Sequence, residues 1–179
     1  LFCAAAWKPL LANWQRRSFA APLALANLVL AGMLLTLPQA RATLIDTTSA
    51  QRYEQASAWL QANSAPGSRV FQSDWDDFAQ LFFYNTHNTY TLGLDPTYMH
   101  LFDPELYHLW RDTTRGWGNI GPVIKEKFAA SFALTDLSQQ GFIDKADRDP
   151  WLKRVYEDEY AIIYQVLDQP DPGKKSWYD

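Results

Sequence analysis

One long uncharged segment near the N-terminus constrains this chain most. No charged residue occurs between positions 18 and 40, and its central part, residues 23–35, carries a single polar side chain, that of Asn27. Roughly 20 apolar residues are enough for a helix to cross the hydrocarbon core of a membrane. Pro22 falls in the first turn of such a helix, where its missing N–H costs little, and Pro38 is expected to close the other end. The segment therefore predicts a transmembrane helix over residues 18–40.

A cleavable signal peptide is the alternative interpretation of this segment. It would also combine basic residues with an apolar run, and residues 39–42 imitate a small-residue cleavage site. Its apolar core should be shorter, however, and residues 1–17, of mixed sequence, precede the run. We therefore favour the membrane-spanning helix.

The charges that flank the segment predict its orientation. Lys8, Arg16 and Arg17 precede it, whereas Arg41 stands alone directly after it. Because basic residues concentrate on the cytoplasmic side of membrane proteins, we expect the N-terminal side to be cytoplasmic and the long C-terminal part to lie outside, at a bacterial-type inner membrane.

The chain divides into four segments on this interpretation. Residues 1–17 form a cytoplasmic segment whose apolar start suggests the end of an earlier membrane helix, and hence a piece of a larger polytopic protein. Residues 18–40 cross the membrane and residues 41–167 form an extracytoplasmic α/β domain. Residues 168–179 form a charged, proline-containing loose tail.

Hydrophobic patterns in residues 41–167 predict the fold class. Short apolar strands alternate with helical segments, which is typical of βαβ units. The last two strands are close enough to form a hairpin. We therefore expect a mainly parallel sheet with helices on both faces and an antiparallel hairpin at the C-terminus. The expected strands are 69–72, 90–94, 131–135, 152–156 and 160–166; the expected helices are 53–63, opened by a capping box at Thr48 and Gln51, then 78–84, 97–101, 104–113, 123–128 and 139–146.

Composition and motifs exclude several classes of function. The net charge is −4 and Lys and Arg form no long run, so a nucleic-acid partner is not expected. The single Cys3 excludes an internal disulfide framework and multi-cysteine metal sites. The nucleotide-binding and serine-hydrolase glycine motifs are absent, and His87, His100 and His108 lack metal-site spacing. No catalytic residue and no metal ligand is therefore assigned.

Acidic residues follow each of the three predicted parallel strands. The carboxyl ends of such strands share one edge of a sheet, where ligands bind in α/β proteins. Carboxylates suit a divalent cation, a hydroxyl-rich sugar or an ammonium group. An aspartate after a strand is also a common turn former or helix N-cap, and Asp95 before Pro96 fits that structural role well. The candidates are Asp74, Asp76 and Asp77 after the first strand, Asp95 after the second and Asp136 after the third.

The loop after the first strand is the strongest candidate for a ligand-contacting site. Three carboxylates, those of Asp74, Asp76 and Asp77, surround Trp75. Like charges repel and a large ring is exposed, which is a poor choice for a simple turn. We therefore expect this loop to face a substrate, with the indole stacking on it and the carboxylates accepting hydrogen bonds or helping to hold a divalent cation.

Three stretches, together with the preceding helix, resemble a known class of membrane enzyme. Residues 70–78, 90–96 and 155–166 are similar, in this order, to the C-terminal end of polytopic GT-C-type glycosyltransferases, the class that includes protein mannosyltransferases and oligosaccharyltransferases. Trp75 and Asp76 match the second Trp and the Asp of the W-W-D-Y-G motif of oligosaccharyltransferases. The neighbouring Asp74, Asp77 and Phe78 depart from that motif.

The resemblance implies a role in moving sugar from a polyprenyl-phosphate-linked donor. The catalytic carboxylate of such enzymes lies in loops between earlier helices, so this chain would be a non-catalytic portion that contributes acceptor or donor contacts. Its implied partners are membrane lipid, the lipid-linked sugar donor and the missing transmembrane part of the same protein. The alternatives are a membrane-anchored binding or sensor module, and a structural subunit that uses the aromatic segments 78–84 and 107–110 as contact surfaces.

Overall fold

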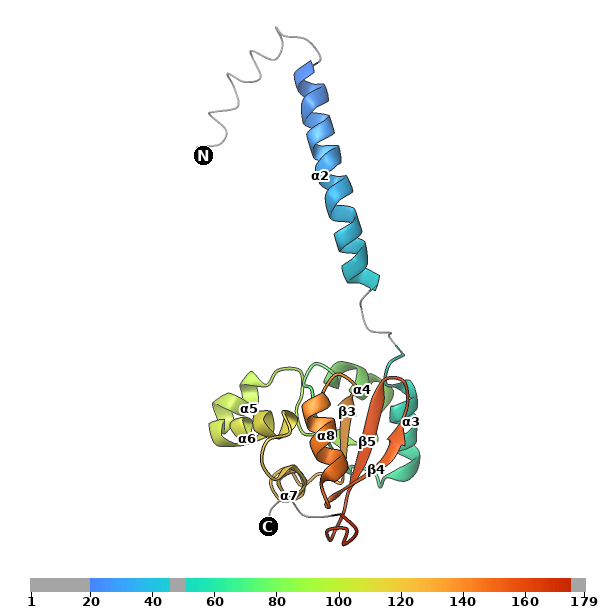
Figure 1. The fold of residues 1–179 in the computed structure, drawn as a ribbon, viewed down its shortest axis with the longest axis vertical. Helices are drawn as coiled ribbons and strands as arrows, with labels where there is room; N and C mark the ends of the chain where they lie inside the picture. The colour runs from blue at the N-terminus through green and yellow to red at the C-terminus, as the bar shows by residue number, and fades with distance from the viewer. Residues whose placement is uncertain (1–19, 46–50, 175–179) are drawn as a thin grey trace. The chain divides into compact units, whose positions relative to one another are not determined.

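The computed structural model describes residues 20–45 and 51–174, and the chain divides into two units between Thr48 and Ser49. The first unit contains the helix α2, Ala20–Ile45, and the second is an α/β domain (Figure 1). The capping box predicted at Thr48 and Gln51 falls partly outside the described residues.

Helix α2 is long and apolar enough to cross a membrane. Its apolar window is Ala21–Pro38, none of which is buried, although a signal sequence near the N-terminus would meet the same criterion. The Asn27 side-chain amide donates to the Leu23 carbonyl oxygen (2.7 Å), and Thr36 Oγ1 donates to the Gly32 carbonyl oxygen (3.0 Å). Both polar side chains are thus satisfied within the helix, as hydrocarbon surroundings require.

The expected end of this helix at Pro38 is wrong, because Pro38 lies inside α2 and the helix continues to Ile45. A proline removes one backbone hydrogen bond and crowds the preceding turn, but this does not always end a helix. The strong helix formers on both sides of Pro38, mainly Ala and Leu, continue the helical conformation past it.

The α/β domain contains one five-stranded sheet with the strand order β2-β1-β3-β5-β4. Strands β2, β1 and β3 are parallel, whereas β5 pairs antiparallel with both β3 and β4. The prediction of a mainly parallel core with an antiparallel hairpin at its end is confirmed. The strands are β1, Arg69–Gln72; β2, Thr89–Tyr90; β3, Phe132–Asp136; β4, Leu152–Glu157; and β5, Ala161–Val166.

The described α/β domain also contains six helices, and most agree with the sequence patterns. Asp103 caps α6 as predicted, accepting a hydrogen bond from the Leu106 N–H (2.9 Å), with Pro104 at the first helical position. Helix α7 starts earlier than predicted, because Gly121 and Pro122 fall in its first turn, where a proline is tolerated. The helices of this domain are α3, Glu54–Asn63; α4, Phe78–Tyr84; α5, Thr97–Phe102; α6, Pro104–Thr114; α7, Ile120–Glu126; and α8, Gln140–Arg148.

Strand β2 is shorter than the predicted strand 90–94. The Thr91 N–H is shared between the Val70 carbonyl oxygen of β1 (3.0 Å) and the side-chain Oε1 of Gln72 (3.0 Å). At Leu92 the buried Gln72 side chain is the partner: its amide donates to the Leu92 carbonyl oxygen and its Oε1 accepts from the Leu92 N–H (3.4 Å), and the strand ladder stops. Gly93 and Leu94 are exposed and lie outside the sheet.

The core consists of two clusters that take alternate residues of the sheet. One contains Val70 with residues of α3 and α4, and the other contains Phe71 with residues of α6, α7 and α8. Alternation of this kind is expected where successive side chains of a strand point to opposite faces. The finer prediction, helices on both faces of the sheet, stays a prediction.

Candidate functional site

The acidic loop and Asp136 lie next to one another because they follow two neighbouring parallel strands. Strand β1 leads into Ser73 and the loop 74–77, and the adjacent strand β3 ends at Asp136. Ser73 ties the two strand ends together: its N–H donates to the Leu134 carbonyl oxygen (3.0 Å), and its hydroxyl donates to Thr135 Oγ1 (2.7 Å). The predicted gathering of carboxylates at one edge is therefore found for these two strands.

Asp136 has a structural role at the start of α8. Its Oδ1 accepts hydrogen bonds from the Ser138 N–H and hydroxyl (both 2.7 Å) and from the Gln139 N–H (3.1 Å). Its Oδ2 lies 2.9 Å from the Arg52 guanidinium. Both carboxylate oxygens of this buried residue are thus engaged by protein groups.

Asp77 is buried beside the same guanidinium, which lies 3.7 Å from its Oδ1. Burial raises the pKa of the Asp77 carboxyl to about 7; Tyr53 and Arg52 oppose this shift, whereas the charges of Asp136 and Asp74 add to it. A carboxyl with this pKa exchanges its proton near neutral pH, which is the property of a general acid or base.

The Tyr53 hydroxyl lies beside the Asp77 carboxyl. Tyr53 Oη and Asp77 Oδ2 are both buried, and neither has a hydrogen-bond partner within the described part of the chain. Burial, and next to it the Asp77 charge, raises the pKa of Tyr53, so its hydroxyl keeps its proton. The buried centre thus consists of Arg52, Tyr53, Asp77 and Asp136; below we call these four residues the Arg52 cluster.

The outer part of the loop is open to solvent. Asp76 is exposed and Trp75 is 42% exposed. Asp74 is half-buried: its Oδ2 accepts from the Gln139 side-chain amide (3.2 Å) and its Oδ1 from the Asp76 N–H (3.5 Å). Burial, followed by the charge of Asp76, raises the pKa of Asp74. The surface available to a ligand is therefore an indole with a carboxylate on each side, carried on the buried Arg52 cluster.

Asp95 does not join this group among the described interactions. Its carboxylate is exposed, accepts a hydrogen bond from the Thr97 N–H (2.8 Å), and stands just before helix α5. Bonding to Thr97 lowers the pKa of Asp95. This is the turn-forming role that an Asp-Pro pair favours, so the structure gives Asp95 a local partner and no link to the acidic loop.

The donor set does not favour a divalent cation. No group of three or more His, Cys, Asp or Glu side chains is arranged to hold a metal in residues 20–45 and 51–174. The Arg52 guanidinium already supplies the positive charge between Asp77 and Asp136. His87 bonds the Ser64 carbonyl oxygen (2.9 Å), and the rings of His100 and His108 pack on each other.

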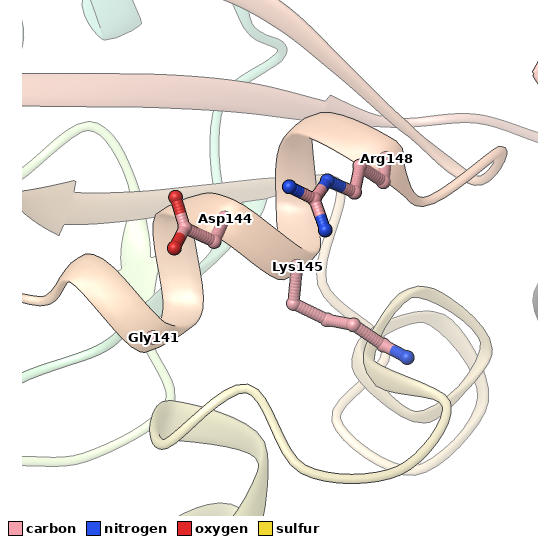
Figure 2. Close-up of a pocket in the computed structure, with 4 residues that line it drawn as sticks. All are labelled: Gly141, Asp144, Lys145 and Arg148. Carbon is pink, nitrogen blue, oxygen red and sulfur yellow. The ribbon is translucent and has the colours of Figure 1, made fainter.

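Two described cavities of the α/β domain lie away from the acidic loop. One, of about 280 Å³, is lined by Gly141, Asp144, Lys145 and Arg148 of α8; Figure 2 shows the Asp144 carboxylate and the Lys145 amine pointing in different directions. The other, of about 440 Å³, adjoins the opposite ends of the strands, near Ser131. Neither cavity is lined by a predicted site residue.

Two members of the Arg52 cluster were missed by sequence reasoning. The sequence patterns did not single out Arg52, and Tyr53 was predicted only as an inward-facing residue at the start of the helix 53–63. The available signal was a lone arginine ahead of a domain whose strand ends carry several aspartates, since buried carboxylates need a cation.

Comparison with known proteins gives no relative for this chain: no family model, no curated protein and no solved structure matches it. The fold and the site therefore define only a coarse class, an α/β domain preceded by one apolar helix that is long enough to cross a membrane.

Proposed function

We propose that this chain is the extracytoplasmic C-terminal part of a membrane glycosyltransferase-like protein that moves sugar from a polyprenyl-phosphate-linked donor. In this proposal α2 crosses the membrane with its N-terminal side in the cytoplasm. The loop 74–77 contacts the sugar of the donor or the acceptor, and the chemical step belongs to another part of the protein.

The observation that carries the proposal is the composition of the exposed part of the loop. Trp75 presents a partly exposed ring, and the carboxylates of Asp74 and Asp76 flank it. An aromatic face packs against the apolar face of a sugar ring, and carboxylate oxygens accept hydrogen bonds from its hydroxyls. The buried Arg52 cluster fixes the base of the loop, so little ordering is needed when a ligand binds.

A non-catalytic, membrane-anchored binding or sensor module is the second candidate. It is favoured because Arg52 and Ser138 already bind the carboxylates of Asp77 and Asp136, which leaves these two groups less available for chemistry on a ligand. The exposed loop would then bind the same kind of ligand without supporting its transfer.

Replacing Trp75 with Ala, or Asp76 with Asn, should reduce sugar transfer by the full-length membrane protein. Loss of one stacking contact or one charge-assisted hydrogen bond costs about 1 kcal/mol or more, which corresponds to a roughly fivefold reduction in kcat/KM. Transfer is measured in membranes with a radiolabelled polyprenyl-phosphate sugar.

The matched controls are Trp117→Ala and Glu126→Gln, which alter exposed side chains in other parts of the α/β domain. These two variants should retain full transfer. If Trp75→Ala and Asp76→Asn also retain full transfer while binding to the headgroup is unchanged, the loop is not the sugar-contacting surface. The sensor module would be favoured by a different pair of results: the native protein transfers no sugar, and the Trp75→Ala and Asp76→Asn variants no longer bind the sugar headgroup.

A further inference from the structure

Helix α5 exposes an apolar face. Tyr98, Leu101 and Phe102 are spaced so that they lie on one side of a helix, and Leu94 stands one turn before them. All four are exposed, and the Phe102 side chain is 92% exposed. Single exposed apolar residues are ordinary, but a contiguous group of this kind marks a surface for a partner or a lipid. We call these four residues the α5 face.

The domain holds this face outward. Met99, on the other side of the helix, packs against the core cluster that contains Phe71. Asp95 fixes the start of α5, and the Asp103 N–H donates to the Met99 carbonyl oxygen (2.8 Å) at its end. The exposed side chains therefore belong to a helix whose two ends are fixed by local hydrogen bonds and whose other side packs on the core through Met99.

The composition of the α5 face suits a lipid interface. No Lys or Arg occurs between Arg69 and Arg111, so α5 and the loops on either side of it carry no cation that would select anionic lipid. Tyrosine at a membrane surface places its ring among the acyl chains and its hydroxyl at the headgroups, and Phe and Leu insert beside it. Such insertion does not depend on lipid charge.

The covalent link limits how far Arg52 can lie from the end of α2. Arg52 is bound to Asp77 and Asp136 at the carboxyl end of the parallel strands. Seven residues after Ile45, the end of α2, the chain is thus fixed at this edge, and seven residues span at most about 25 Å. This limit holds for any arrangement of the two units.

The α5 face belongs to the same edge of the sheet. Helix α5 follows the carboxyl end of β2, which pairs in parallel with β1, and the acidic loop follows the carboxyl end of β1. Figure 1 shows α4 and α5 toward one end of the α/β domain and α7 at the other. The α5 face and Arg52, the residue nearest in sequence to α2 that is fixed at the sheet, therefore belong to the same edge of the sheet.

We infer that the α5 face docks on the outer lipid surface of the membrane that α2 crosses. This inference rests on the membrane-spanning role of α2 in the proposed function. Docking holds the acidic loop close to the headgroup layer, which is where the sugar of a lipid-linked donor lies. The ligand class that fits the loop is thus a sugar presented on a lipid, rather than a free sugar in solution.

The test measures how deeply labelled positions enter a bilayer. The full chain, with Cys3 replaced by Ser, is reconstituted in nanodiscs of phosphatidylcholine and carries one fluorophore on Thr97→Cys, on Lys127→Cys or on Leu28→Cys. Nitroxide-labelled lipids quench fluorophores that enter the bilayer. Position 97 adjoins the α5 face, position 127 follows α7, and position 28 reports on α2.

We expect quenching at position 97 to be severalfold stronger than at position 127, and quenching at position 28 to be strongest. Serine at positions 98, 101 and 102 together should lower quenching at position 97 to the level of position 127 while the circular dichroism is unchanged. Equal quenching at 97 and 127, with position 28 quenched, overturns the inference alone. An unquenched position 28 removes the membrane span, and with it both proposals. If position 97 is not quenched by the labelled lipids but becomes shielded from solvent when the remainder of the protein is present, the α5 face is a protein contact, and the inference is also overturned.

Discussion

We expect the native α/β domain to lose stability as the pH rises from about 4 to 7, and replacing Asp77 with Asn should abolish most of this loss. The folded domain raises the Asp77 pKa to about 7, whereas an aspartate in an unfolded chain has a pKa of about 4. The folded state therefore binds this proton more tightly. Its contribution to stability is complete below about pH 4 and is lost as the pH rises through about 7, with a cost on the order of 4 kcal/mol.

The measurement is urea unfolding of the full chain in detergent micelles, followed by tryptophan fluorescence at several pH values across this range. Asp77→Asn keeps the shape of the neutral carboxyl and should be more stable than the native chain above neutral pH. Asp76→Asn, which alters an exposed carboxylate of the same loop, serves as the control and should keep the native pH dependence. Identical pH profiles for the native chain and Asp77→Asn would show that Asp77 titrates normally.

Replacing Arg52 with Gln should destabilise the α/β domain strongly at neutral and higher pH. Arg52 is the cation between two buried carboxylates, and removing one partner of a buried ion pair typically costs about 3 kcal/mol or more. The Asp77 pKa should rise further, because the guanidinium lowers it in the native domain. The loss of stability should therefore shrink as the pH falls and the carboxylates take up protons.

The control for this variant is Arg111→Gln. Arg111 pairs with Asp112 at 2.9 Å, but both side chains are more than one-third exposed, and such pairs contribute about 1 kcal/mol or less. Unfolding free energies are compared at the same pH values as above. A cost for Arg52→Gln no larger than that for Arg111→Gln would mean that the Arg52 cluster does not hold the strand ends together.

Local patterns predicted most of the fold. The hairpin β4–β5, the strand β1 and the cap of α6 at Asp103 all follow from short-range rules, and the structure contains them. The length of β2 was misjudged because the partner of Leu92 is the side chain of Gln72 rather than a strand backbone, which no pattern within residues 90–94 can reveal. Long-range side-chain pairing of this kind overrides local strand propensity.

The candidate site was predicted only in part. The acidic loop and Asp136 meet because parallel neighbouring strands end together, which is a rule of topology. Asp95 was included by the same rule, but it serves the start of α5. Arg52 escaped notice because its partners lie far along the chain. The contact surface suggested at residues 107–110 is wrong for Trp110, because this residue is buried and its indole N–H donates to the Gln72 carbonyl oxygen (3.3 Å).

The most direct test of this account is the membrane topology of the full-length protein. Cys3 is replaced by Ser, a single cysteine replaces the exposed Glu126, and intact cells are treated with a membrane-impermeant maleimide. The account predicts labelling without permeabilisation, together with a protein that remains in the membrane after alkaline carbonate extraction. A protein that is released by carbonate, or that is labelled only after the cells are opened, would contradict an outward domain tethered by α2.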